Sequence, residues 1–152
     1  MSDKLVEGNW LSSNKFDPRA VAIYERHYSA RRYADGRKRT QFVGPGECMV
    51  LLTVGCDALF VWVRNRMERY DGQVGVNCAV FRNEGAVLSS ALIREADELA
   101  DQRWPGERHF TYVEDAKIRS SNPGCCFLKA GWRRAGRNAT GKLTLLERAY
   151  QT

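Results

Sequence analysis

The stretch that decides the fold is residues 74–113, VGVNCAVFRNEGAVLSSALIREADELADQRWPGERHFTYV. It begins with a β-rich run over residues 74–81 and a turn that carries Gly85. Apolar side chains then recur at helical spacing through residues 91–102, and residues 109–113 form a short aromatic strand. Because a helix of crossover length joins the two strands, we predict that they are parallel neighbours in one sheet.

The flanking segments add helices and strands to this unit. Asp17 and Pro18 supply a helix cap and a first-turn proline, and apolar spacing continues the helix to about Arg32. Residues 34–45 are polar and contain glycine, which indicates a basic loop. A short helix is expected over residues 125–130, closed by a glycine cap. Further strands are expected at residues 49–54, 58–63, 132–137 and 143–146.

Length and composition favour one globular domain over residues 1–152, with a helix and basic loop in residues 1–45 and a sheet core in residues 46–152. The apolar runs are far shorter than the roughly 20 residues that span a bilayer, which argues against a membrane partner. The first residues lack a signal-peptide pattern, so we expect a cytoplasmic protein. The five cysteines have no zinc-ligand spacing, which indicates free thiols.

The net charge of +6 is unevenly distributed. Residues 26–39 hold six basic side chains and one acid, and residues 116–146 hold seven basic side chains and no acid. Between them, residues 86–115 hold seven acids and three arginines. A basic side of this kind suits a phosphate-rich partner, either nucleic acid or a nucleotide cofactor. Two merely solvated surfaces are the alternative interpretation.

A strand that runs through a glycine turn into a helix start is an anion-binding arrangement, because backbone amides and the helix dipole point at the ligand. Here the turn reads RNEGAV over residues 82–87. Arg82 and Gly85 are therefore candidate cofactor-binding residues, although a strand-end arginine is also an ordinary surface residue. Ser89 and Ser90 are candidates for the same site and for capping the helix.

This turn resembles the pyrophosphate-binding loop of the GNAT acyltransferases, Arg/Gln-x-x-Gly-x-Gly/Ala, but Val87 departs from the pattern. Residues 122–132, NPGCCFLKAGW, are similar to the end of a GNAT domain, where an asparagine precedes a helix that closes in Tyr-x-x-x-Gly-Phe. The resemblance implies a single α/β domain flanked by helices, with a mixed sheet whose parallel strands, 74–81 and 109–113, splay around a coenzyme A cleft. Asn122 becomes a further cofactor-binding candidate, and acetyl-CoA or a related acyl-CoA becomes the expected cofactor.

Phe127 stands where the GNAT family usually carries the tyrosine that protonates the departing thiolate of coenzyme A. Four alternatives follow from that departure. Cys125, Cys126 or a water supplies the proton, or the chemistry is not ordinary acetyl transfer. Cys125 also begins the expected short helix, a position that favours reactive cysteines, whereas structural thiols are the plainer interpretation of the pair.

A narrower resemblance is to the Mom family of phage proteins, which convert adenine in DNA to N6-(carbamoylmethyl)adenine and so protect phage DNA from restriction. It is carried by RHYS at residues 26–29, by Arg82, and by IRSSNPG at residues 118–124. The resemblance extends from about Ala20 to Glu147. It implies a transferase that modifies the N6 amino group of adenine in double-stranded DNA.

The candidate catalytic residues are Cys125, already named, together with His27, Tyr28 and Asp115. Histidine suits a general base or a metal ligand, and the Mom resemblance implies an Fe(II) site with His27 and Tyr28 as ligands; packing beside aromatic residues is the alternative. Asp115 follows the strand at residues 109–113, at the end where parallel sheets form sites, and orients the exocyclic amine or caps a turn.

The expected DNA contacts are Arg31, Arg32, Arg37, Lys38 and Arg39. Since the adenine N6 group is paired inside a duplex, the base has to be flipped out for modification. The alternatives are a GNAT N-acetyltransferase that acts on a small-molecule or protein amine and a non-enzymatic DNA-binding accessory protein. A homodimer is left open.

Overall fold

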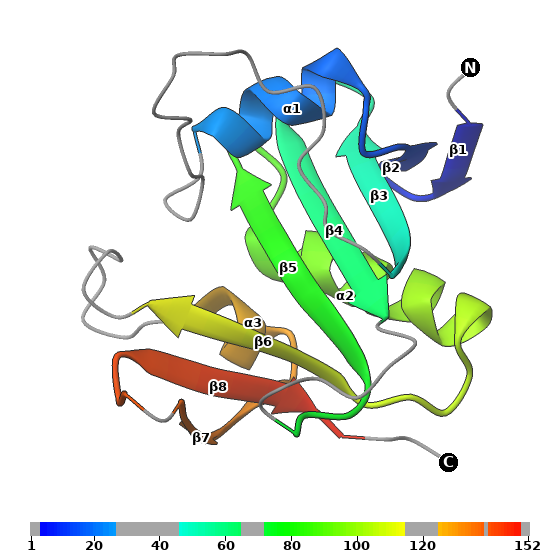
Figure 1. Cartoon of the computed structure of the whole chain (residues 1–152). Coiled ribbons are helices and arrows are strands. Elements are labelled where there is room, and N and C mark those ends of the chain that lie inside the picture. Colours follow the sequence, from blue (N-terminus) through cyan, green and yellow to red (C-terminus); the bar gives the residue numbers. More distant parts are fainter. Residues whose placement is uncertain (1–3, 27–45, 65–71, 115–124, 139, 150–152) are drawn as a thin grey trace.

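The computed structural model describes residues 4–26, 46–64, 72–114, 125–138 and 140–149, which form an α/β fold around one mixed sheet (Figure 1). The strand order is β1-β2-β3-β4-β5-β6-β8-β7, and β5 and β6 are its parallel pair. The strands are β1 (Lys4–Glu7), β2 (Trp10–Ser13), β3 (Glu47–Thr53), β4 (Ala58–Arg64), β5 (Val76–Asn83), β6 (His109–Glu114), β7 (Arg133–Arg137) and β8 (Leu143–Arg148). The helices are α1 (Pro18–Glu25), α2 (Ser89–Arg103) and α3 (Cys125–Lys129).

The unit over residues 74–113 has the predicted architecture. Strand β5 leads through a turn into α2, and α2 leads into β6, which pairs with β5 in parallel. The predicted hairpin is also confirmed, because β3 and β4 pair as antiparallel neighbours. At the end of α3, Gly131 adopts a φ of +97°, a left-handed conformation that suits a glycine helix cap.

The sheet also takes in β1 and β2, which the sequence analysis does not anticipate. Each of these strands has four residues, too few for a clear alternating pattern. Tertiary contacts hold them in place. Asn9 donates its side-chain amide to Glu95 of α2, at 3.2 Å, and the fully buried Trp10 donates its indole N–H to the Leu92 carbonyl at 3.0 Å.

Helix α2 is the central support of one face of the sheet. Its apolar residues pack with side chains of β3, β4, β5 and α3 in the larger core cluster. Trp62 of β4 donates its indole N–H to the Ala96 carbonyl at 3.0 Å, and Trp132 donates its own to Asp97 at 2.9 Å. Because tryptophan combines a large apolar area with one donor, these bonds fix the rotation of α2 on the sheet.

Helix α1 covers part of the other face, across the ends of β3, β4 and β5 (Figure 1). Asp17 caps this helix as predicted, accepting from the Arg19 backbone amide at 2.9 Å. Hydrogen bonds from Arg19 lower the pKa of Asp17 to about 2, against an opposing effect of burial. The described part of α1 ends at Glu25, and the predicted continuation to Arg32 and the basic loop lie outside the described residues.

Among the described residues, no helix has both the length and the apolar character needed to cross a membrane.

Candidate functional site

Strands β5 and β6 pair at one end and separate toward the other. Their parallel register consists of Val76 with His109 and Asn77 with Phe110. One residue further, the Thr111 hydroxyl donates to the Cys78 carbonyl at 2.8 Å. Beyond this bridge the register has no further pairs in the described strands, and Figure 1 shows them diverging toward their C-terminal ends. In this part of the described strands, β5 and β6 do not pair with each other.

A β-bulge lies in β5 beside this separation. Val61 of β4 pairs with Val80, whereas the next residue, Trp62, pairs with Cys78. Ala79 is therefore the extra residue of the bulge, and it is exposed although its neighbours on both sides are buried. Bulges bend a strand and interrupt its ladder, and they are over-represented next to active sites. The bulge favours the open end of β5 and β6 as the candidate site.

Helix α2 begins at this open end without a side-chain cap. Its N-cap residue is Leu88, which makes no capping hydrogen bond, so the prediction that Ser89 or Ser90 caps the helix is wrong. Both serines lie inside the first turn; Ser90 is buried, and the Ser89 hydroxyl accepts from Asn83 at 2.9 Å. Among the described residues, the backbone amides of residues 86–90 have no hydrogen-bond partner. Free amides at an uncapped helix start are suited to an anion.

Asn83 shapes the turn between β5 and α2. Its side-chain amide donates to the Val87 carbonyl at 2.7 Å, and its side-chain oxygen accepts from the Gly85 amide at 3.0 Å. The Gly85 amide is therefore already occupied. A side chain at Gly85 would collide with the carboxylate of Asp57, so glycine is needed there for close packing against the β3–β4 turn. Gly85 thus shapes the turn, and its role in cofactor binding stays a prediction.

An ion-pair cluster joins the end of α1 to this turn. Glu84 accepts from Arg26, which follows α1, at 2.6 and 2.7 Å, and from Arg82 of β5 at 2.6 Å. Hydrogen bonds from Arg26, and then from Arg82, lower the pKa of Glu84 to about 2. The same contact raises the pKa of Arg26. The two guanidinium groups and the Glu84 carboxylate form a charged cluster at the open end of the strands.

Three described parts of the chain border the opening between β5 and β6. The end of α1 at Arg26 meets the turn after β5 through Glu84, and the end of β6 lies across the opening between the two strands (Figure 1). Several predicted site residues lie outside the described residues. They are the catalytic candidates His27, Tyr28 and Asp115, the cofactor candidate Asn122, and the DNA-binding candidates Arg31, Arg32, Arg37, Lys38 and Arg39. Of the predicted site residues, the structure describes Arg82, Gly85, Ser89, Ser90 and Cys125.

Helix α3 places Phe127 in the core. The Phe127 ring lies with its centroid 4.8 Å from that of Trp132 and 5.9 Å from that of Phe81, and the residue is buried. Cys126 packs beside it, and burial raises the pKa of its thiol. Cys125 is half-buried. Because burial holds Cys126 in its protonated form, this thiol is suited to packing rather than to nucleophilic chemistry.

Among the described residues, no group of three or more histidine, cysteine, aspartate or glutamate side chains is arranged to hold a metal ion. The predicted iron ligands, His27 and Tyr28, lie outside that part of the chain. The Fe(II) site therefore stays a prediction.

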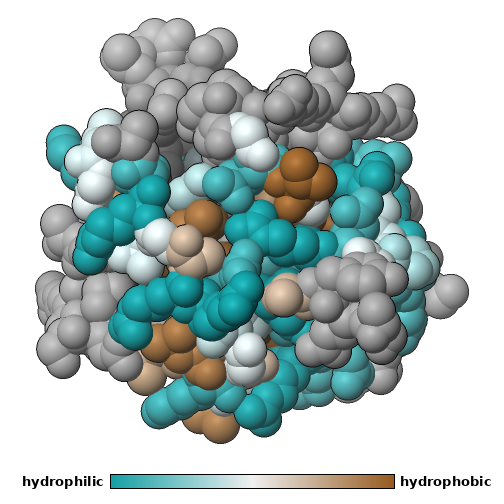
Figure 2. Space-filling model, turned by 90° about the horizontal axis from the view of Figure 1, so that it is seen from below, coloured by the Kyte–Doolittle hydropathy of each residue, from teal (hydrophilic) through white to brown (hydrophobic). Residues whose placement is uncertain are grey.

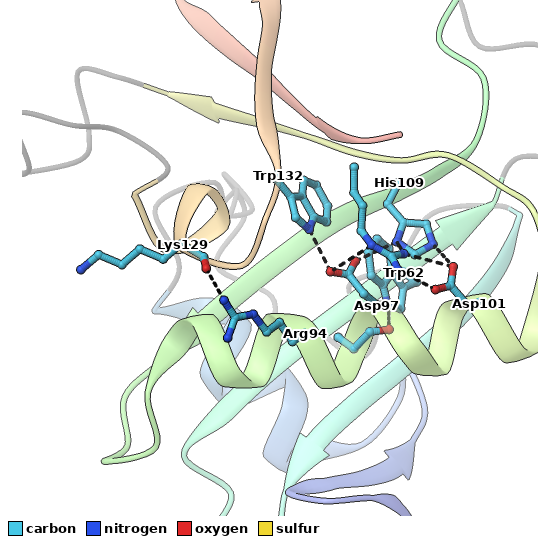
Figure 3. Close-up of polar contacts among 9 residues, drawn as sticks. Trp62, Arg94, Asp97, Asp101, His109, Lys129 and Trp132 are labelled. Atoms are coloured by element: carbon cyan, nitrogen blue, oxygen red, sulfur yellow. Dashed lines mark hydrogen bonds and ion pairs between the residues drawn. The ribbon is translucent and has the colours of Figure 1, made fainter. Parts of the chain in front are cut away.

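A buried polar cluster lies at the closed end of β5 and β6, and the sequence analysis did not select it (Figure 3). His109 is fully buried, and its Nδ1 lies 2.7 Å from the Asp97 carboxylate, which also accepts from Trp132. Arg148 contacts the Asp101 carboxylate at 2.8 Å. His109 Nε2 lies 3.3 Å from Asp101 but makes no hydrogen bond to a described residue. This cluster connects α2 to β6, β8 and the residue before β7.

One signal in the sequence points to this cluster. Asp97 follows Ile93 by one helical turn, so it lies on the apolar face of α2, where a charged residue needs a partner. Its side chain is 3% exposed and that of His109 is 0% exposed, so neither can touch a substrate in this conformation. We therefore assign the pair a structural role, which is to hold the closed end together.

Comparison of the chain with protein-family models, with curated proteins and with solved structures found no match. The geometry of the site and the residues themselves therefore carry the functional interpretation.

Proposed function

We propose that this protein is a GNAT-type transferase that modifies the N6 amino group of adenine in double-stranded DNA, as the Mom family does. The observation that carries the proposal is the contact of Arg26 and Arg82 with one carboxylate, Glu84. It joins two segments of the Mom resemblance that are far apart in the sequence. Both segments meet at the open end of β5 and β6, where an α/β sheet of this kind binds ligands.

The fold supports a coenzyme A-type cofactor at this end. One parallel pair of strands that separates toward its C-terminal ends supports the splayed strands that the GNAT resemblance implies. The amides of residues 86–90 and the side chain of Arg82 would hold the pyrophosphate, since the helix start lacks a cap and Arg82 is 35% exposed. When bound, an acyl-CoA would supply an activated acyl group for transfer to an amine, with the coenzyme A thiol as the leaving group. The carboxylate of Glu84 does not oppose this binding, because Arg26 and Arg82 already neutralise it.

The DNA substrate requires two further things of the chain. The adenine has to leave the base stack, at a cost of a few kcal/mol, so the duplex has to be gripped beside the site. The N6 amine also has to lose a proton as its new bond forms, which needs a general base. His27 and Asp115 are the proposed bases: His27 directly follows Arg26, and Asp115 directly follows Glu114 at the end of β6.

The packing of α3 argues against ordinary acetyl transfer. Phe127 occupies the position of the usual tyrosine acid and is buried among aromatic rings, with no hydroxyl to donate. The nearest thiols are Cys126, which burial keeps protonated, and the half-buried Cys125. A GNAT N-acetyltransferase remains the second candidate because it shares the cofactor cleft, and it needs one of these thiols or a water as its acid.

Nucleoside mass analysis of DNA from cells that express the protein tests the proposal. A modified adenine is the expected result, and its mass identifies the group that has been added. Unmodified DNA together with acetyl-CoA turnover by the purified protein would instead establish the N-acetyltransferase. Unmodified DNA without turnover would reject both enzymes and leave a DNA-binding accessory protein.

A further inference from the structure

Strand β7 forms an edge of the sheet and is exposed along its whole length. Its sequence, RRAGR, carries three arginines in five residues, and two lysines lie close to it in the chain. The basic residues of this region are Lys129, Arg133, Arg134, Arg137 and Lys142, all exposed. The acidic residue in residues 125–149 is Glu147, which two arginines share, Arg108 at 2.7 Å and Arg133 at 2.6 Å. The edge therefore carries a concentration of exposed basic side chains.

A second β-bulge, in β7, determines which face of the sheet each of these arginines points to. Arg134 pairs with Leu146 and Arg137 pairs with Thr144, so Ala135 is the extra residue. Leu146 and Thr144 are two residues apart on β8, so their side chains point to the same face of the sheet. Arg134 and Arg137, three apart in sequence, thus share a face, whereas a regular strand would place them on opposite faces.

The shared face is the one that α2 and α3 cover, because Leu146 packs in the same core cluster as Phe127 of α3. Lys129 ends α3 on this side, and Arg94 of α2 holds its carbonyl at 2.6 Å (Figure 3). Arg133 instead pairs with Glu147, which lies on the opposite face. Figure 2 shows the molecule from below, the side on which β7 and β8 lie in Figure 1, with a mainly hydrophilic surface.

The register relates this surface to the proposed site. Arg137 pairs with Thr144, which pairs with Val113 near the end of β6, where the strands are open. Two strand spacings separate β7 from β6, roughly 10 Å. A duplex whose backbone lies on β7 would thus have a base within reach of the open end once that base is flipped out.

We infer that Lys129, Arg134 and Arg137 form a contact surface for the sugar-phosphate backbone of double-stranded DNA, and that this surface positions the duplex for the adenine chemistry. The role of this surface in adenine modification rests on the proposed function, but the binding of a duplex to the surface can be tested separately. Arginine and lysine contacts to phosphates carry no sequence information, so the surface should hold a duplex of any sequence.

The test is fluorescence anisotropy of a labelled duplex that contains only G·C pairs, titrated with the full-length protein at several salt concentrations. Such a duplex has no adenine, so the readout does not depend on modification. Each lost phosphate contact reduces the slope of log affinity against log salt by about 0.9. We expect Arg134→Gln/Arg137→Gln to reduce the slope by about twice that amount.

Two controls separate a local contact from net charge. Lys15→Gln/Arg103→Gln removes the same two charges at sites away from β7 and should keep the wild-type slope. Arg133→Gln removes one charge from the same strand but from the opposite face, and should also keep it. Circular dichroism checks that all variants fold.

The inference would be overturned if the wild type, Arg134→Gln/Arg137→Gln and the Lys15→Gln/Arg103→Gln control all had the same salt slope. It would also be overturned if the salt slope fell by the same amount in the two double variants. Adenine modification is measured in parallel on genomic DNA. Modified adenine with unchanged slopes would reject the surface and leave the proposed function intact. A reduced slope without modified adenine would support the surface while rejecting the proposed function.

Discussion

The two ends of the β5–β6 pair differ in what their charged side chains can reach. At the closed end, Asp97 and His109 are 3% and 0% exposed and bond to each other. At the open end, Arg26 and Arg82 are 49% and 35% exposed and share Glu84. Both ends hold polar side chains in contact, but the Asp97–His109 pair is buried in the core and the cluster of Arg26, Glu84 and Arg82 is partly exposed. A polar cluster therefore indicates a ligand site only where a ligand can reach it, whereas the buried cluster connects α2 to β6 and β8.

The largest effect is expected at the open end, on activity. Arg82→Ala should lower adenine modification by roughly 10- to 100-fold, because a hydrogen bond to a charged group is worth about 1.5–3 kcal/mol. Stability should change by less than about 0.5 kcal/mol, since the side chain is partly exposed. Nucleoside mass analysis and urea unfolding measure the two quantities. Arg103→Ala is the control, and wild-type modification by Arg82→Ala would remove the phosphate-loop assignment.

The largest loss of stability is expected at the closed end. Asp97→Ala leaves His109, Trp132 and Arg148 without their shared carboxylate, and removing one partner of a buried ion pair typically costs about 3–5 kcal/mol. For a chain of this size the melting temperature should fall by roughly 6–20 °C. The control is Glu98→Ala, on the exposed face of the same helix. A fall as small as that of Glu98→Ala would show that the buried cluster is not what holds the closed end.

A smaller effect on stability is expected at the hydrogen bond between Thr111 and Cys78, which lies between the paired and the separated parts of β5 and β6. Thr111→Val keeps the shape of the side chain but removes the hydrogen bond to the Cys78 carbonyl, which should cost about 1 kcal/mol of unfolding free energy. Thr111→Ser retains the hydroxyl and separates the loss of the bond from the loss of packing. If Thr111→Val unfolds at the same urea concentration as the wild type, the hydroxyl bridge does not contribute to the junction.

The Glu84 cluster should appear in the acid stability of the protein. The pKa of Glu84 is about 2 in the folded state, below the ordinary value of 4.5 for a glutamate, so the folded state binds fewer protons than the unfolded state as the pH falls. The contact therefore stabilises the fold above about pH 4.5 and is progressively lost toward pH 2. Glu84→Gln should reduce the pH dependence of the unfolding free energy in this range by at most one proton equivalent. An unchanged dependence would contradict the ion-pair geometry.

The thiols should show the smallest functional effect. Cys125→Ala and Cys126→Ala should each retain adenine modification, because the proposed chemistry does not need either thiol. In the folded protein a maleimide reagent should label the half-buried Cys125 well before the buried Cys78, which mass spectrometry of peptides can follow. Loss of modification in Cys125→Ala, with the fold intact, would favour the acetyltransferase alternative.

Much of the fold follows from local patterns. The helical spacing after residue 90, the β-rich runs on each side of it and the length of the connection predict the parallel pair of β5 and β6. The Asp17 cap and the glycine at position 131 mark helix ends through local hydrogen bonding and a positive φ. The N-terminal strands were missed because their stability comes from contacts with α2, which no local pattern records.

Sequence patterns alone were enough to place most elements in order and to locate the excess of basic residues after residue 116. Only the tertiary structure decided which side chains meet. Arg26 and Glu84 are 58 residues apart, and the bulges at Ala79 and Ala135 set which faces the following side chains point to. The physical reason is that spacing fixes the direction of a side chain within its own element, whereas contact between elements depends on register and packing, which one extra residue in a strand can change.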